Sequence, residues 1–402
     1  MRLAEWRGAS GAWATALVLA TSTVSCSSCR SDPGKADASS TRIASAGSTG
    51  SVASSPSADI SPSVPRPGMV WIPAGTLRAG TPPARTPRIA DEEMAATPIE
   101  MGGFYIDSLP WPNEPNAIPT SNVAREEAEQ LCASKGKRLC SELEWERACK
   151  GPESTTYEYG DVYRKDACGT GAILEQASRR PTGEHAQCKT GFGVFEMHGG
   201  VWEWTSSAWG RGSRDASQGV LRGGNSVAGE LVGRCANAIA RSPSKKSPTM
   251  GFRCCAGTKN VAEVKLDLQG TPGLAAASAH AANPWGAALV SAADGGAPAI
   301  DPKSLRAWSW IPVANEELVI AMGCTVAPKV CALAIARPSI ADGGAESGDV
   351  LGVMSTGKEL PEVARNGDAR HLRMRSLDPR GVYSRDITYL YGRVDLGDPK
   401  RP

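Results

Sequence analysis

The sequence predicts an α+β protein with two globular regions behind an N-terminal extension. At 402 residues the chain is long enough for about two domains of ~100–200 residues each. It contains 44 Gly and 29 Pro, a composition that excludes one long helical array. Only 41% of the residues are hydrophobic, which excludes a protein that crosses the membrane many times. Short strand patterns and two helix patterns with capping residues indicate mixed α and β structure.

The charge balance excludes one class of function. The chain has 44 Lys and Arg against 42 Asp and Glu, a formal net charge of +2. A protein that holds nucleic acid by charge alone is strongly basic. We therefore expect no nucleic-acid partner.

Residues 1–25 have the layout of a secretory signal peptide. Arg2 and Arg7 give a positive start, residues 12–20 are uncharged and mostly apolar, and residues 21–25 are small and polar. The alternative is a spanning helix, but the apolar stretch is shorter than the ~20 residues that a span needs. We therefore expect export and cleavage.

Residues 23–26, Thr-Val-Ser-Cys, resemble the bacterial lipobox, in which the cysteine is lipidated and becomes the first residue. Thr23 departs from the usual Leu, and ordinary cleavage nearby is the alternative. A lipid on Cys26 would tether the protein to a membrane. We expect a lipoprotein of the bacterial cell envelope, in the outer membrane and facing the periplasm or the surface.

Residues 26–67 are predicted to be a flexible linker behind this anchor. The stretch is rich in Ser, Ala, Gly, Pro and Thr and has no aromatic residue. Such a segment cannot bury enough apolar surface to repay the entropy of ordering it.

Residues 68–257 begin with strand patterns, at 69–72 and at 104–107. Ser121 or Asn122 is expected to cap a first helix, and Gly136 ends it. Residues 141–144, Ser-Glu-Leu-Glu, form a capping-box sequence that starts a second, short helix.

Later in this region, residues 201–204 alternate and predict a strand with Trp202 and Trp204 on one face. With Trp209 these rings either support the fold or stack on a sugar or peptide.

Seven segments of this region, taken in order, resemble the sulfatase-modifying factor domain of formylglycine-generating enzymes. They are residues 69–75, 104–107, 136–146, 159–161, 191–204, 222–224 and 251–254. The resemblance implies an irregular, loop-rich α+β fold distantly related to C-type lectins. It assigns residues 68–257 to one domain of this family.

The chain has twelve Cys, which favours an oxidising compartment. With Cys26 and Cys29 set aside, ten remain, and an even number suits full pairing. The resemblance implies two disulfides, Cys132–Cys254 and Cys149–Cys235. For the remaining cysteines we hypothesise three pairs: Cys168–Cys188, Cys140–Cys255 and Cys324–Cys331. A metal site is the weaker alternative, because no C-x-x-C pair lies near a His with ligand spacing.

The resemblance also implies where a catalytic centre would be. The family oxidises a substrate cysteine to formylglycine with O2 and a copper ion, which two cysteines hold between the R-G-G segment and the later Arg-Cys. In this chain that interval, residues 225–234, reads NSVAGELVGR and contains no cysteine. Because Cu(I) prefers soft thiolate ligands, we expect no copper and no catalytic residue here.

The sequence therefore favours a non-catalytic binding or scaffold module for an envelope protein, a peptide or a glycan. The alternative is an oxidoreductase that modifies a sulfatase cysteine, or another oxidase with an unrecognised site. Iron-dependent sulfur oxidation, as in ergothioneine biosynthesis, needs a His pair in an additional N-terminal domain. The first His of this chain is His185, so we do not expect that chemistry. We expect His198 to be an ordinary loop residue.

Calcium is the cofactor that the resemblance leaves open. The family motif G-N-V-W-E-W helps to bind a structural calcium, and here Gly200 replaces its Asn while Glu203 remains. A hard cation needs several oxygen ligands, so Glu203 is either a weak calcium ligand or a solvated strand carboxylate. The late loops also carry five basic residues, expected as a solvated surface or, alternatively, an anion site: Arg234, Arg241, Lys245, Lys246 and Arg253.

Residues 258–402 resemble no family and are expected to form a small β-rich domain with disordered stretches. Residues 317–322 and 330–336 read as a hairpin that Cys324 and Cys331 could clip. Residues 389–394 read as one late strand.

Overall fold

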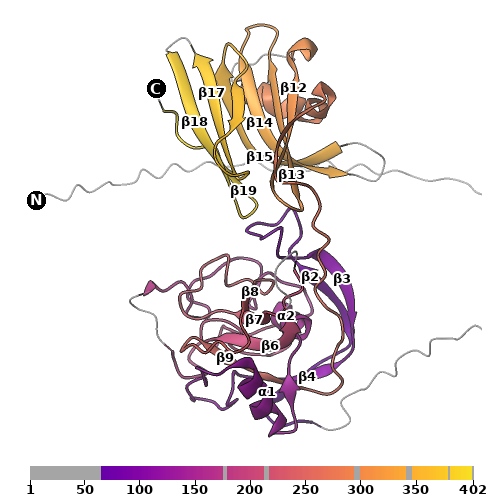
Figure 1. Ribbon diagram of the computed structural model, residues 1–402, viewed down its shortest axis with the longest axis vertical. Coiled ribbons are helices and arrows are strands. Elements are labelled where there is room, and N and C mark those ends of the chain that lie inside the picture. Colours follow the sequence, from indigo (N-terminus) through magenta and orange to yellow (C-terminus); the bar gives the residue numbers. More distant parts are fainter. Residues whose placement is uncertain are drawn as a thin grey trace, which may run out of the picture. The chain divides into compact units, whose positions relative to one another are not determined.

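The computed structural model describes residues 65–174, 179–211, 217–293, 299–340, 346–378 and 381–400 (Figure 1). These residues are mostly β with few helices. The predicted signal peptide, Cys26 and the linker up to residue 64 lie outside them. Within the described ranges, no helix combines the length and the apolar character that a bilayer crossing requires.

The first region contains two four-stranded sheets and a separate hairpin. The sheet orders are β1-β4-β10-β5 and β8-β7-β6-β9, and β2 pairs with β3. The pairings between these strands are antiparallel except that of β6 with β9, which is parallel. The elements are β1 (Met69–Ile72), β2 (Gly75–Gly80), β3 (Ala95–Met101), β4 (Phe104–Asp107), α1 (Arg125–Ala133), β5 (Arg138–Leu139), α2 (Glu142–Lys150), β6 (Trp202–Ala208), β7 (Gly219–Gly223), β8 (Ala238–Arg241), β9 (Met250–Phe252) and β10 (Cys254–Ala256).

Helix α1 begins later than the sequence predicts. Its N-cap is Ala124, whose backbone N–H donates to the carboxylate of Glu127 at 2.8 Å. Asn122 lies in the left-handed region at φ 63°, and its N–H donates to the carbonyls of Ser247 and Met250. These hydrogen bonds hold the backbone of Asn122 in a non-helical conformation two residues before the N-cap. Neither Ser121 nor Asn122 can therefore cap the helix.

Helix α2 begins with the predicted capping box. The Ser141 N–H donates to Glu144 Oε2 at 2.8 Å, and the Glu144 N–H donates to Ser141 Oγ at 3.2 Å. All nine residues of the helix are buried, including its charged ones. A charged residue in the interior needs a partner. Arg222 from β7 supplies one by pairing with Glu142 and Glu146.

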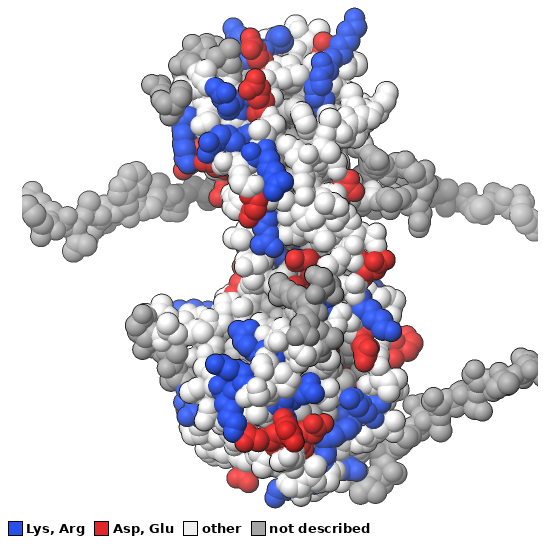
Figure 2. Space-filling model, in the orientation of Figure 1, with Lys and Arg blue, Asp and Glu red and all other residues white. Residues whose placement is uncertain are grey.

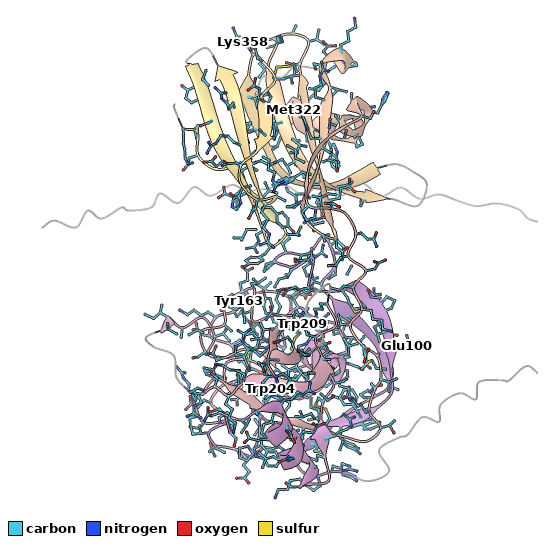
Figure 3. The ribbon with its side chains drawn as sticks, in the orientation of Figure 1. Glu100, Tyr163, Trp204, Trp209, Met322 and Lys358 are labelled. Atoms are coloured by element: carbon cyan, nitrogen blue, oxygen red, sulfur yellow. A yellow bond between two sulfur atoms is a disulfide. The ribbon has the colours of Figure 1, made fainter. Side chains whose placement is uncertain are left out.

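The tryptophans of β6 and the turn after it support the core. Trp204 and Trp209 are each 1% exposed, and Figure 3 shows both inside the region. Trp202 is partly buried and packs in the same cluster as Trp204, with Leu221 and Phe252. The geometry therefore favours the structural role of these rings over stacking on a ligand.

The second region contains two antiparallel sheets, ordered β11-β12-β13-β14-β15 and β16-β17-β18-β19. Residues of both pack in one core, for example Trp310 and Ile320 with Leu372 and Ile387. The elements are β11 (Gly273–Ala277), η2 (Ala279–Trp285), α3 (Gly286–Ala292), η3 (Pro302–Ser304), β12 (Arg306–Val313), β13 (Glu316–Cys324), β14 (Cys331–Ile340), β15 (Glu346–Gly357), β16 (Glu362–Arg365), β17 (His371–Asp378), β18 (Gly381–Leu390) and β19 (Arg393–Asp395).

The predicted hairpin is confirmed, whereas the predicted late strand is not one strand. Strands β13 and β14 pair with Cys324 opposite Cys331, as the pattern indicated. Residues 389–394 instead turn at Tyr391 and Gly392, which have φ 49° and 85°, and the chain returns as β19. Two consecutive positive φ angles are typical of a tight hairpin turn, and Gly adopts them without strain.

Candidate functional site

The interval that would carry the copper ligands, residues 225–234, connects β7 to β8. The next residue, Cys235, is bonded to Cys149. Every other cysteine among the described residues is also in a disulfide, and the partners are those paired above: Cys132–Cys254, Cys140–Cys255, Cys168–Cys188 and Cys324–Cys331. A disulfide offers no thiolate, so these residues do not fit a copper site of this kind.

Two tyrosines lie against this interval. The Tyr157 hydroxyl donates to the Glu230 carbonyl at 3.2 Å, and the Tyr163 hydroxyl to the Ala228 carbonyl at 3.4 Å. Tyr157 also stacks on Tyr159, with ring centroids 5.6 Å apart and an interplanar angle of 6°. Burial raises the pKa of Tyr159 to about 12. The hydroxyl groups of two tyrosines therefore contact the backbone of this interval.

Glu203 is buried, and both of its carboxylate oxygens accept hydrogen bonds from neighbouring side chains. Its Oε2 accepts from Trp145 Nε1 and from Arg253 Nε, each at 2.7 Å, and its Oε1 accepts from Arg253 Nη2 at 2.9 Å. A calcium ion would have to displace these donors and lie beside a guanidinium. The residues here do not fit a calcium site, and Glu203 is an interior ion-pair partner rather than a solvated carboxylate.

The expected basic surface of the late loops is smaller than the sequence indicates. Arg234 and Arg253 are 0% and 1% exposed. Arg234 Nη2 pairs with Glu93 Oε1 at 2.5 Å. Burial alone would raise the pKa of Glu93, but the charge and hydrogen bonds of Arg234 outweigh it and hold the pKa below its usual value. These two arginines therefore stabilise the interior and cannot meet an anionic ligand.

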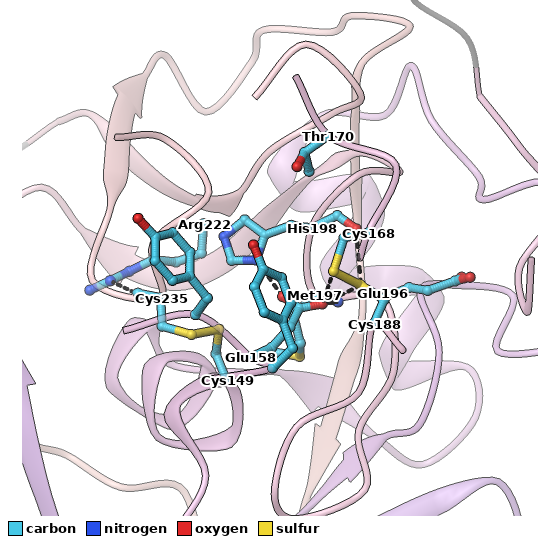
Figure 4. Close-up of polar contacts among 12 residues, drawn as sticks. Cys149, Glu158, Cys168, Thr170, Cys188, Glu196, Met197, His198, Arg222 and Cys235 are labelled. Atoms are coloured by element: carbon cyan, nitrogen blue, oxygen red, sulfur yellow. Dashed lines mark hydrogen bonds and ion pairs between the residues drawn. A yellow bond between two sulfur atoms is a disulfide. The ribbon is translucent and has the colours of Figure 1, made fainter. Parts of the chain in front are cut away.

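A buried acid–base pair lies between two disulfides (Figure 4). Glu158 Oε2 is 2.5 Å from His198 Nδ1, and Glu158 Oε1 accepts from the Met197 N–H at 3.2 Å. The same Oε1 is 2.9 Å from the sulfur of Cys168 and also contacts that of Cys188. His198 Nε2 is buried and has no hydrogen-bond partner among the described residues.

This pair offers little as a metal site. The sulfurs nearest to Glu158 and His198 belong to disulfides and are poor ligands. Glu158 was not found from the sequence, because it meets His198 across 40 positions and no motif spacing joins them. His198 was expected as a loop residue, and it does lie in an irregular segment, but the segment buries it.

Comparison with known families names the region that carries these residues. Residues 109–257 match the family described as "Sulfatase-modifying factor enzyme 1-like domain". This stretch of the chain is a domain of that family. The resemblance read from the sequence is thereby confirmed.

Relatives of this sulfatase-modifying factor domain include proteins named as enzymes and one named as inactive. The chain is 26% identical over 154 residues to "Inactive C-alpha-formylglycine-generating enzyme 2" of Bos taurus, covering 35% of this chain and 50% of the relative. It is 26% identical over 163 residues to "Formylglycine-generating enzyme" of Mus musculus, covering 34% and 44%. It is 35% identical over 109 residues to "Hercynine oxygenase" of Mycolicibacterium thermoresistibile, covering 26% and 23%. The chain thus spans about half the length, or less, of these relatives.

Among solved structures, PvdO from Pseudomonas aeruginosa aligns with a TM-score of 0.39 at 19% identity, covering 46% of this chain and 93% of that one. The sites described above all lie within residues 109–257, which match the family. They are the interval 225–234, the Glu158–His198 pair and the Glu203–Arg253 pair.

Proposed function

We propose that the sulfatase-modifying factor domain of this chain is a non-catalytic binding or scaffold module. One observation carries the proposal: the interval 225–234 has no cysteine, and the ten cysteines of the described residues are bonded to one another. The interval, the Glu158–His198 pair and the Glu203–Arg253 pair supply no thiolate and no open set of oxygen ligands. We accordingly propose that neither copper nor a calcium ion at Glu203 takes part.

The relatives support this reading without deciding it. One is named an inactive C-alpha-formylglycine-generating enzyme and another a formylglycine-generating enzyme, at the same 26% identity. Similarity alone therefore does not separate the two functions, and the missing thiolates support the non-catalytic one. An irregular α+β fold distantly related to C-type lectins would suit a binding role, with a protein, peptide or glycan of the envelope as the partner.

A turnover assay tests the non-catalytic proposal. The purified protein is incubated with Cu(I), O2 and a peptide that carries a sulfatase cysteine, beside an active formylglycine-generating enzyme. We expect formylglycine from the active enzyme and none from this protein, by mass spectrometry of the peptide. Formylglycine above the no-protein blank would overturn the proposal and support the oxidoreductase alternative.

We also propose that the protein is exported and held at the bacterial cell envelope by a lipid on Cys26. The five disulfides of the structure are consistent with an oxidising compartment outside the cytoplasm. Metabolic labelling with a fatty-acid analogue tests the anchor. We expect label on the wild-type protein and none on Cys26→Ser, and an unlabelled wild-type protein would remove the anchor from the proposal.

A further inference from the structure

A cavity of about 300 Å³ lies on the first region, apart from the interval 225–234. Strand β2, the loop that follows it and the loop after α2 form its walls, and Arg78, Arg85 and Lys150 line it. Pockets for small molecules begin at about this size. The cavity therefore suits a small ligand or a single chemical group.

The charges of the lining differ in how far the protein already uses them. Lys150 is buried, donates to the carbonyls of Arg78 and Gly80, and pairs with Glu146 at 2.8 Å. The protein thus fixes this ammonium group and partly neutralises its charge.

Arg85 is half-exposed and is held from one side. Its Nη1 donates to Thr156 Oγ1 at 2.7 Å and pairs with Asp161. The other guanidinium nitrogens of Arg85 make no hydrogen bond to the described residues. The arginine is therefore positioned while part of its donor set stays available.

Arg78 is the lining cation that the described structure leaves without an electrostatic partner. Its side chain extends from β2, is exposed, and forms no hydrogen bond or ion pair with a described residue. Glu153 is the acidic residue of the lining, and it is exposed as well. Two of the three basic side chains already have a carboxylate partner, Lys150 in Glu146 and Arg85 in Asp161, so Arg78 supplies the uncompensated positive charge of the lining.

Two residues of the cavity wall have an unusual backbone conformation. Ala96 and Ser154 line it at φ 58° and 55°, a left-handed conformation that residues other than glycine rarely adopt. Such a conformation persists where surrounding contacts impose it. The next residue, Thr155, donates from its N–H to the Lys150 carbonyl at 3.0 Å. This hydrogen bond ties the loop after α2 to the end of the helix, which reduces the entropy that a ligand would remove by ordering the loop.

We propose that this cavity binds one anionic group, a carboxylate, sulfate or phosphate of a small ligand, between Arg78 and Arg85. A guanidinium presents several N–H donors in one plane and matches the paired oxygens of these groups, and Lys150 adds a fixed positive charge. On the face drawn in Figure 2, Lys and Arg are interspersed with Asp and Glu. The basic residues of that face are therefore not gathered into one broad basic surface.

Titration calorimetry on the full chain tests this inference. Sodium sulfate, inorganic phosphate and sodium acetate are titrated separately at constant ionic strength set with NaCl. We expect saturable binding of at least one of them, and the one that binds most tightly identifies the anionic group. No saturable heat with any of the three would overturn the inference.

Two variants locate the site. Arg78→Gln is expected to weaken binding about tenfold or more, because it removes the unpaired guanidinium. Arg365→Gln, an exposed arginine of β16 that does not line the cavity, is the matched control and is expected to bind as the wild type does. Equal affinity of Arg78→Gln and the wild type would overturn the inference. Arg78 is exposed, so thermal unfolding of the variant should match the wild type and rule out misfolding as the cause.

The result is independent of the catalytic assay. The lining lies outside residues 225–234, and anion binding does not require the domain to be inactive. Formylglycine formation with anion binding would overturn only the proposed function, whereas the absence of both would overturn only the anion site.

Discussion

At the scale of single residues, the interior accommodates the carboxylate of Glu203 because Arg253 and Trp145 donate hydrogen bonds to it. Replacing one member of a buried ion pair leaves the other charge without compensation. We expect Glu203→Gln to lower the free energy of unfolding by ~3–5 kcal/mol, measured by urea denaturation.

The matched control for this prediction is Glu129→Gln on the exposed side of α1. Glu129 has no partner among the described residues, so Glu129→Gln is expected to change the free energy of unfolding by no more than ~0.5 kcal/mol. Calcium added to the wild-type protein should leave the melting temperature unchanged, because the oxygens of Glu203 are already occupied. Similar losses in both variants, or a calcium-dependent rise in melting temperature, would contradict this account.

Tyr159 makes the stability of the folded protein depend on pH in the alkaline range. Burial raises its pKa to about 12, whereas a tyrosine of the unfolded chain ionises near pH 10. The folded protein therefore keeps a proton that the unfolded chain loses, and stability falls as the pH rises from ~10 to 12. The tyrosinate absorbance of the wild type minus that of Tyr159→Phe should show no ionisation of this residue at pH 10.5. A midpoint near pH 10 in this difference would show that Tyr159 is solvated.

At the scale of elements, local patterns determine some features and distant contacts determine others. The capping box of α2 and the β13–β14 hairpin were predictable because neighbouring residues form them. The start of α1 was not, since the carbonyls of Ser247 and Met250 hold Asn122 outside the helix. The turn at Tyr391 was not predicted either, because the strand-like pattern of residues 389–394 continues through it.

The candidate site divides in the same way. The absence of a thiol from residues 225–234 could be predicted from the sequence, because the order of the family motifs defines this interval. The roles of Glu203 and Arg253 could not be predicted, because their burial follows from the pairing of β6 with β9, which brings Arg253 next to Glu203. The cavity around Arg78 joins residues from separate parts of the sequence, and no motif marks it.

The disulfides predict unequal contributions to stability. Cys132–Cys254 closes a loop of sequence separation 122, whereas Cys324–Cys331 clips a hairpin of separation 7. In the chain-entropy model these closures contribute ~5 and ~2 kcal/mol. We expect the double variant Cys132→Ser/Cys254→Ser to lose more stability in urea than Cys324→Ser/Cys331→Ser. The opposite order would show that local packing outweighs chain entropy here.

At the scale of the whole molecule, the first region continues past the end that the motifs indicate. The sequence places its end at Gly257, but Val264 and Leu266 pack with Leu77 and Leu143 in one hydrophobic cluster. The Asn260 N–H also donates to Glu144 Oε1 at 3.0 Å. The segment after β10 therefore completes a core built by β2 and α2. Motifs of the family could not show this, because it depends on which side chains that segment buries.

Two valines of this segment test whether it belongs to the core. Val264 is 5% exposed in the cluster with Leu77, whereas Val261 is 87% exposed. Truncating a buried valine removes about two methyl-sized groups from a packed core, so Val264→Ala should lower the free energy of unfolding by ~2 kcal/mol. Val261→Ala makes the same chemical change in solvent and should stay within ~0.5 kcal/mol of the wild type. Urea denaturation of both variants measures the difference, and equal stabilities would show that residues 258–266 lie outside the folded core.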